Sequence, residues 1–329
     1  MFFVHGGGFY CGDAVMYGDV GICRRLVTKD IIVVTIQYRV GYLGFWCSDD
    51  PLIPPNLGLW DQCAALRWTH DNIAAFGGDK VYCLFRSVVA MSGNAYCDWA
   101  FNDREEVMAD LTKLLSTLSS DCVETAVKNS VPEGVTKCAN TRDTFRRIYI
   151  ADKDLRSKKR MFKGRMELES DELFNAPTLR LVQEQLRINM GSSLPVFLYV
   201  FTYCNPRSIG CLRFLIKHKE ATHGTEMPYL FATPLVIPMK FDARDERMID
   251  CLTTVFTNFV KYSDPNGPPS SPSQLELSWP RVTEKEAERH LVFNDSLAVL
   301  DRFFEGRPAT IVEYQNEARR NAENGENGK

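Results

Sequence analysis

The stretch Phe2-Phe3-Val4-His5-Gly6-Gly7-Gly8-Phe9 is an apolar run that leads directly into His-Gly-Gly-Gly. The apolar residues before the glycines are typical of a short strand. Three consecutive glycines let the backbone approach a cleft, because they carry no side chains that would block it. Backbone N–H groups presented in this way can stabilise a negative charge that develops on oxygen. We therefore predict a strand followed by an anion-binding loop, with a flexible glycine turn as the alternative.

A helix and a second strand complete the unit around this loop. Residues 20–27 have the spacing of a short amphipathic helix, and residues 31–39 are almost continuously apolar and β-branched. Such an apolar run is typical of a strand that is buried on both faces of a parallel sheet. Strand, helix and strand in this order form a crossover unit. The sequence therefore predicts the α/β class.

A long helix is predicted after the proline-rich loop that follows. Asn56 stands where a helix cap is expected, and Phe76-Gly77-Gly78-Asp79 supplies a glycine terminator. Between them, apolar residues recur at helical spacing. These residues are Leu59, Trp60, Cys63, Leu66 and Ile73.

Three blocks together resemble the type B carboxylesterase/cholinesterase family. They are His5 to Phe9 (HGGGF), Gln37 to Phe45 (QYRVGYLGF) and Asn56 to Asp79 (NLGLWDQCAALRWTHDNIAAFGGD), and they occur in the family's order and at its spacing. Further similar blocks lie at 88–95, 170–177, 194–203, 223–231 and 258–267, so the resemblance covers most of residues 1 to about 305. It implies an α/β-hydrolase fold, with a mostly parallel central sheet flanked by helices, and carboxylic ester hydrolysis by a serine-hydrolase mechanism.

The family's nucleophile elbow, Gly-x-Ser-x-Gly, does not occur in this chain. In the family, the Phe-Gly-Gly-Asp block leads within a few residues to a buried strand and then to this elbow. Here Asp79 is followed by Lys80 to Ser87, in which Leu84-Phe85 already resembles what the family has after the elbow. We therefore expect an incomplete fold, in which the nucleophile-elbow strand and the N-terminal strands that the family places before the glycine loop are missing.

The resemblance assigns two parts of a catalytic site. Gly7 and Gly8 match the oxyanion hole, and His223, in the context Thr-His-Gly-Thr-Glu-Met, matches the catalytic histidine. Glu133, in the only Glu-Gly pair near the expected position, is the candidate acid, with an ordinary surface turn as the alternative. Glu226 is interpreted as a helix-side salt-bridge residue rather than as an acid.

No residue is assigned as the nucleophile. Ser87, Ser92 and Cys83 lie near the lost elbow, but neither serine is on a predicted strand-to-helix turn. Removal of a triad serine costs about 10⁶-fold in turnover, and loss of an oxyanion donor costs roughly 3 kcal/mol more. We therefore expect an impaired or inactive carboxylesterase. Two alternatives stay open: a non-catalytic cholinesterase-like binding or adhesion protein, and an incomplete gene model of an active esterase.

Composition excludes several other classes. The 329 residues are 45% hydrophobic and 25% charged, with a net charge of −3 and no basic stripe, which argues against a nucleic-acid partner. No apolar run is long enough for a transmembrane segment. The eleven cysteines include no Cys-x-x-Cys pair, so neither a metal nor another cofactor is expected. If the chain is active, its partners are small-molecule carboxylic esters, and the sequence does not indicate an oligomeric state.

Two expectations concern organisation and compartment. We expect one partial hydrolase domain over residues 1–312 and a disordered polar tail over 313–329. The glycine loop is preceded by no basic n-region and no signal-type cleavage site, so the sequence as written predicts a cytoplasmic chain. A longer form that is secreted or directed to the endoplasmic-reticulum lumen is the alternative.

Overall fold

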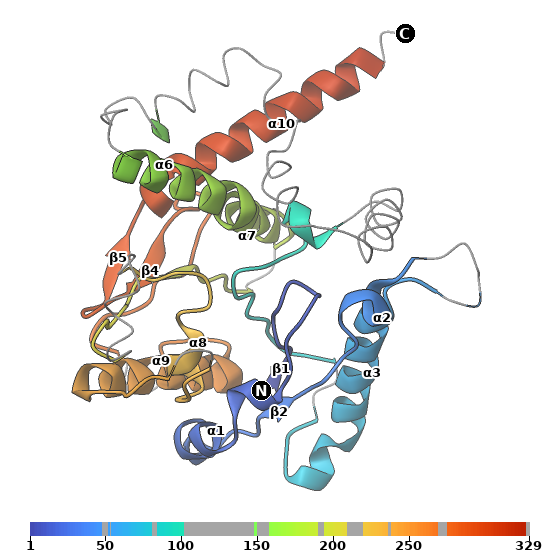
Figure 1. The fold of residues 1–329 in the computed structure, drawn as a ribbon, viewed down its shortest axis with the longest axis vertical. Coiled ribbons are helices and arrows are strands. Elements are labelled where there is room, and N and C mark those ends of the chain that lie inside the picture. Colours follow the sequence, from blue (N-terminus) through green and yellow to red (C-terminus); the bar gives the residue numbers. More distant parts are fainter. Residues whose placement is uncertain are drawn as a thin grey trace, which may run out of the picture. The chain divides into compact units, whose positions relative to one another are not determined.

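The computed structural model describes residues 1–47, 52, 54–80, 84–101, 148–149, 158–189, 194–208, 220–235, 238–268 and 275–326. The chain divides into two compact units: Met1–Ser92 with Asn189–Asp301, and Gly93–Ile188 with Arg302–Lys329. Figure 1 shows the elements, coloured along the sequence. Gly7, Gly8 and His223 all belong to the first unit. The apolar spacing of residues 103–118 predicts a further helix, and both this segment and the candidate acid Glu133 lie outside the described residues.

The strands of the first unit form two small sheets. In one sheet, β1 (Phe2–Phe3) pairs in parallel with β2 (Val34–Thr35). In the other, β4 (His290–Phe293) pairs in parallel with β3 (Tyr199–Phe201) and antiparallel with β5 (Ala298–Leu300). The parallel crossover around the glycine loop is thus confirmed.

Two strand predictions need correction. The apolar run 31–39 is not buried on both faces, because Ile36 and Tyr38 are buried whereas Gln37 and Arg39 are exposed. This alternation is typical of a strand with one covered face, and among the described strands β2 pairs only with β1. The apolar residues of His290–Phe293 predict the last strand of the sheet, and this segment is a strand, but β5 follows it in the chain.

The helices of the first unit include the two that the sequence predicts, near residues 20–27 and after Asn56 (Figure 1). The first unit contains α1 (Val20–Arg25), α2 (Gly41–Phe45), α3 (Leu57–Asn72), α8 (Met227–Leu230) and α9 (Ala243–Tyr262), with 3₁₀ turns at Val15–Tyr17, Val27–Lys29 and Ile73–Phe76. None of the described helices has the length and apolar character needed to cross a membrane.

The core of the first unit lies between α9 and the sheet residues around β3 and β4. Asp242 begins α9 with a capping box, and nine of the twenty residues of the helix are buried. Its apolar face includes Leu252 and Val255, each only 1% exposed, and it packs in the same cluster as Leu291 and Phe293 of β4. The amphipathic pattern of residues 248–260 predicts a helix, which is confirmed and begins further toward the N-terminus, at Ala243.

Helix α3 is covered far less. Gly58 is the only one of its sixteen residues that is buried, whereas Leu59, Trp60 and Trp68 are 41%, 64% and 56% exposed. The helix and its end at Gly77, which has a φ of +81°, are confirmed. Asn56 occupies the predicted cap position, but its side chain makes no capping hydrogen bond. The left-handed backbone of Asn56, with φ of +61°, turns the chain into the helix instead.

The second unit is helical in its described part. It contains α6 (Lys158–Ser170), the π-helical turn Asp171–Asn175, α7 (Ala176–Ile188) and α10 (Arg307–Glu326), with short 3₁₀ turns at Asp98–Ala100 and Phe303–Gly306. The buried carboxylate of Asp171 accepts hydrogen bonds from Arg307 Nε (2.7 Å) and the Tyr149 hydroxyl (2.8 Å).

Helix α10 occupies most of the tail for which the polar composition predicts disorder. Ile311 and Val312 are buried in a cluster with Ala176 of α7, and Arg307 is held by Asp171, so the first turns of α10 are fixed. The residues after Tyr314 are mostly alanine, glutamate, arginine and asparagine, and several of these propagate a helix once it has started. The single hydrolase domain predicted for residues 1–312 stays a prediction.

Candidate functional site

The glycine loop after β1 is a tight turn with an exposed backbone. The carbonyl oxygen of Gly7 accepts hydrogen bonds from the backbone N–H groups of Tyr10 (3.0 Å) and Cys11 (3.2 Å). Gly7 has a φ of +126°, and a Cβ atom there would lie 1.9 Å from the carbonyl oxygen of Cys11, so only glycine fits. Gly6, Gly7 and Gly8 are all exposed, which leaves this backbone accessible to a ligand.

A buried aromatic pair lies at the base of the loop. His5 is only 2% exposed, and its ring stacks on that of Tyr38 with 4.3 Å between the centroids and 18° between the planes. The Tyr38 hydroxyl donates a hydrogen bond to the carbonyl oxygen of His5 (2.8 Å). Because Tyr38 follows β2, this contact joins the end of β2 to the point at which the loop leaves β1.

The second and third sequence blocks are joined by Arg39 and Asp61. Arg39 Nε and Nη2 donate to the two carboxylate oxygens of Asp61 at 2.7 and 2.6 Å, and the backbone N–H of Arg39 donates to Oδ2 at 3.0 Å. These hydrogen bonds lower the pKa of Asp61. The pair is largely exposed, so it orients α3 relative to the loop after β2 more than it stabilises the fold.

His223 lies on an exposed turn directly before α8. The backbone N–H of Thr225 donates to the carbonyl oxygen of Thr222 (3.0 Å), and that of Met227 donates to the carbonyl oxygen of Gly224 (3.2 Å). Gly224 has a φ of +79°, a conformation that favours glycine. The predicted histidine therefore stands on a defined turn, with its side chain accessible.

Glu226 lies at the buried end of the same turn. It is only 7% exposed, so it belongs to the core, and the predicted helix-side salt bridge stays a prediction. Burial raises the pKa of Glu226, and this rise is partly offset first by a hydrogen bond from its own backbone N–H group and then by the positive charge of His223.

Tyr17 places the glycine loop and the His223 turn in one neighbourhood. Its ring lies 4.8 Å from that of Phe3 in β1 and 4.8 Å from that of Phe231 after α8. The carboxylate of Glu226 adds to the rise that burial causes in the pKa of Tyr17. Two sequence-predicted parts of the site thus share one intervening side chain.

Of the remaining candidates, Ser87 and Ser92 lie among the described residues. Glu133 and Cys83 lie outside the described residues. The Ser87 hydroxyl is 3.2 Å from that of Ser263 at the end of α9. Ser92 has a positive φ of 54°, and no helix begins at it, so it does not form a strand-to-helix elbow. Within the described ranges, no group of three or more histidine, cysteine, aspartate or glutamate residues could hold a metal ion.

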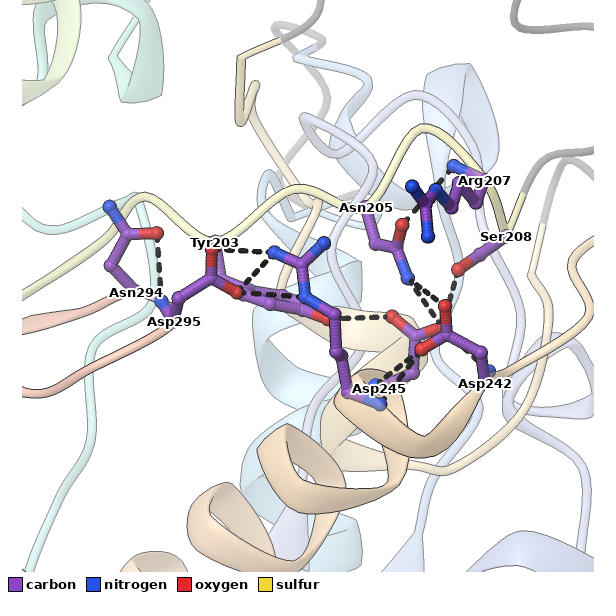
Figure 2. Close-up of polar contacts among 9 residues, drawn as sticks. Tyr203, Asn205, Arg207, Ser208, Asp242, Asp245, Asn294 and Asp295 are labelled. Atoms are coloured by element: carbon purple, nitrogen blue, oxygen red, sulfur yellow. Dashed lines mark hydrogen bonds and ion pairs between the residues drawn. The ribbon is translucent and has the colours of Figure 1, made fainter.

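Sequence reasoning missed a buried polar cluster at the start of α9 (Figure 2). Asp245 is fully buried, and its carboxylate accepts hydrogen bonds from the Tyr203 hydroxyl (2.9 Å), Asn205 Nδ2 (3.1 Å) and the Ser208 hydroxyl. The backbone N–H of Asp242 also donates to it (2.9 Å). The sequence signal was the Asp-x-x-Asp spacing of a capping box, which by itself indicates a helix start and no burial.

This cluster fixes the segment after β3 to α9. Burial and the bond to Asp245 raise the pKa of Tyr203, so its hydroxyl stays protonated and acts as a donor. The ring of Tyr203 packs at 5.2 Å against that of Tyr229 in α8, the helix that follows His223. The cluster therefore supports the His223 turn from the side of the core. Arg244, next to Asp245 in the chain, forms an exposed ion pair with Asp295.

Comparison with known proteins gives consistent matches. A profile of the carboxylesterase family matches residues 1–83 and 106–309. The chain is 23% identical to Esterase cest-33 of Caenorhabditis elegans over 416 aligned residues, which cover 93% of this chain and 74% of that protein. It is 35% identical to Esterase FE4 of Myzus persicae over 138 residues, covering 35% of this chain and 23% of that protein. It is 24% identical to neuroligin-2 of Mus musculus over 417 residues, covering 88% and 48%.

The extent of these matches is informative. The chain spans about half the length of neuroligin-2 and about a quarter of Esterase FE4. In the match to Esterase cest-33, 93% of 329 residues is about 306, so about 110 of the 416 aligned positions have no residue in this chain. The match to the family profile is interrupted after residue 83, beside the point at which the sequence predicts the lost elbow. With most of its residues matched, the chain belongs to the carboxylesterase family, which implies the α/β-hydrolase fold.

Proposed function

We propose that this chain is a carboxylesterase-like protein that retains part of an ester-binding site and has lost the hydrolytic step. The observation that carries the proposal is that no Gly-x-Ser-x-Gly occurs anywhere among the 329 residues. In this mechanism a serine held on that strained turn attacks the ester carbonyl, and no other residue of this chain stands on such a turn in the described part.

In the proposal, the retained parts keep their family roles. Gly7 and Gly8 present backbone N–H groups to the carbonyl oxygen of a bound carboxylic ester, and His223 is the general base that the missing serine would need. Two observations support these roles: the glycine backbone is exposed, and Tyr17 lies next to both the glycine loop and the turn of His223. The N–H group that follows the serine would be a further oxyanion donor, and it is lost together with the elbow.

The proposal extends to the fold. We infer that residues 1–312 form one hydrolase domain whose central sheet lacks the elbow strand. Two observations support this inference: the described strands form separate sheets, β1–β2 and β3–β4–β5, and about 110 aligned positions of Esterase cest-33 have no counterpart here. A strand lost from the middle of a parallel sheet would leave its two neighbours without that pairing partner.

Intact-mass spectrometry after treatment with a fluorophosphonate probe tests the proposal, because the probe reacts with an activated serine. An active esterase of the same family serves as the positive control, and far-ultraviolet circular dichroism with thermal unfolding establishes that the sample is folded. We expect an unchanged mass on a cooperatively folded chain. A stoichiometric adduct that is lost in Ser92→Ala or Ser87→Ala would overturn the proposal and identify the nucleophile. An aggregated or molten sample would overturn the proposed fold.

A non-catalytic binding protein is the second candidate function. The match to neuroligin-2 over 88% of the chain favours it, because this match fits the non-catalytic, cholinesterase-like alternative that the sequence leaves open. Saturation-transfer NMR with a non-hydrolysable ester isostere measures binding of the isostere and separates the two candidate functions. An ester-binding chain gives a signal that Gly7→Ala abolishes, because the added Cβ atom collides with the carbonyl oxygen of Cys11. A purely adhesive chain gives no such signal.

A further inference from the structure

Helix α3 presents one continuous exposed face to solvent. Successive residues of an α-helix are rotated by about 100°, so residues three or four positions apart lie on the same side. Trp60 and Trp68 are 64% and 56% exposed, whereas Gly58, on the opposite side of the helix, is buried. The exposed residues that share one side, which we call the α3 face, are Leu59, Trp60, Cys63, Ala64, Arg67 and Trp68.

The composition of the α3 face is typical of a protein interface. Large apolar side chains that gather on one exposed surface mark an interaction site. Tryptophan and arginine are the residues that contribute most to binding at such sites. The charged member of the face is Arg67, and a guanidinium group stacks on the ring of a tryptophan. The face therefore fits a partner that offers a tryptophan ring together with further apolar side chains.

The α3 face is complementary to itself. Its six residues form three pairs that are symmetric about the midpoint between Cys63 and Ala64: Cys63 with Ala64, Trp60 with Arg67, and Leu59 with Trp68. When two copies of α3 pack antiparallel about a two-fold axis through this midpoint, each residue meets the other member of its pair from the second copy. The small side chains of Cys63 and Ala64 let the helices approach, and Trp60 of each copy meets the guanidinium of Arg67 of the other.

We propose that the α3 face binds the α3 face of a second copy of this chain, which gives an antiparallel two-fold dimer. A tryptophan side chain buries ~150–250 Å² when fully covered, so the exposed parts of Trp60 and Trp68 contribute roughly 200–300 Å² per copy. This area and that of the other four residues stay below the ~800 Å² per partner of a standard interface. The dimer is therefore weak: it forms at micromolar concentrations and dissociates into monomers on dilution.

Sedimentation velocity of the full chain between about 1 and 100 µM tests this inference. We expect the mass to rise with concentration from that of one chain toward that of two. Trp60→Ala should weaken the association roughly tenfold or more, because a two-fold interface loses the ring twice. Phe101→Ala is the matched control: Phe101 is 65% exposed and belongs to the second unit, so its removal should leave the association unchanged. Circular dichroism establishes that both variants are folded.

Oxidation of the thiols with copper phenanthroline tests the register of the two helices. Cys63 lies beside the two-fold axis, where the two Cβ atoms can approach to the ~4 Å that a disulfide needs. We expect a reducible covalent dimer that is lost in Cys63→Ser and kept in Cys23→Ser, since Cys23 is an exposed cysteine of α1.

Four results would overturn the inference. They are a native chain that stays monomeric at 100 µM, association beyond two copies, equal weakening in Trp60→Ala and Phe101→Ala, and a covalent dimer that persists in Cys63→Ser. None of them bears on the loss of hydrolysis, because the fluorophosphonate probe reports on a serine and these measurements report on association.

Discussion

Helices α9 and α3 are both long and both belong to the first unit, but their surroundings differ sharply (Figure 1). Nine residues of α9 are buried, including the polar Asp245, Thr253 and Asn258, whereas α3 buries only Gly58. Both helices carry apolar residues at helical spacing. The difference teaches that such spacing shows which face of a helix is suited to burial, while neighbouring elements determine whether that face is buried. The exposed apolar residues of α3 fit the proposed loss of a central strand.

Replacing a leucine by alanine in each helix should give the largest difference in the free energy of unfolding. Leu252→Ala in α9 removes a side chain that is 1% exposed, and we expect it to lower the free energy of unfolding by about 2–5 kcal/mol. Leu59→Ala in α3 removes one that is 41% exposed, and we expect a change within about 0.5 kcal/mol. Urea unfolding followed by circular dichroism measures both. Equal losses would show that α3 is covered in solution.

The polar cluster of α9 should give the next largest effect. Asp245→Asn replaces an acceptor oxygen with an N–H donor that faces the buried donors of Tyr203, Asn205 and Ser208. We expect the free energy of unfolding to fall by about 2 kcal/mol, since hydrogen bonds to a charged acceptor contribute roughly 1.5–3 kcal/mol each. Asp295→Asn, at the exposed ion pair with Arg244, is the control and should leave urea unfolding nearly unchanged. If Asp295→Asn lowered the free energy of unfolding as much as Asp245→Asn does, burial would not be the reason for the effect at Asp245.

Glu226→Gln should give the smallest effect and one of opposite sign. Burial raises the folded-state pKa of Glu226 above the ordinary value of 4.5, so folding favours the protonated form. Below pH 4.5 the group is protonated in both states and costs nothing, and the cost grows as pH rises through the folded-state pKa. The variant should therefore unfold at a higher temperature than the native chain at pH 7 and at the same temperature near pH 4. Calorimetry at both values measures this, and a lower transition temperature at pH 7 would contradict it.

Much of the fold follows from local sequence patterns, and the rest depends on distant contacts. The parallel pairing of β1 with β2, the extent of α3 to Gly77 and the core of α9 were all predictable, because each depends on a continuous run of apolar spacing or on a glycine terminator. The short length of β2 was not predictable, because the hydrogen bonds of a strand also need a partner strand, which lies far away in the sequence.

The candidate site divides in the same way. The family blocks predict the positions of Gly7, Gly8 and His223, and their roles stay predictions. Nothing local indicates that Glu226 is buried, since that depends on Tyr17 and Tyr199 arriving from other segments. The burial of Asp245 likewise depends on the residues after β3. Single-sequence patterns show which groups are present, and long-range packing decides which of them lose their water.

The exposed aromatic side chains of α3 have a consequence for the life of the protein in a cell. Molecular chaperones and proteases bind apolar segments that folded proteins normally hide, and Trp60 and Trp68 present such a segment while the rest of the chain is folded. The steady-state amount of the protein in a cell should therefore depend on the balance between chaperone binding and proteolysis. Overexpression of a chaperone should raise that amount without any change in transcription.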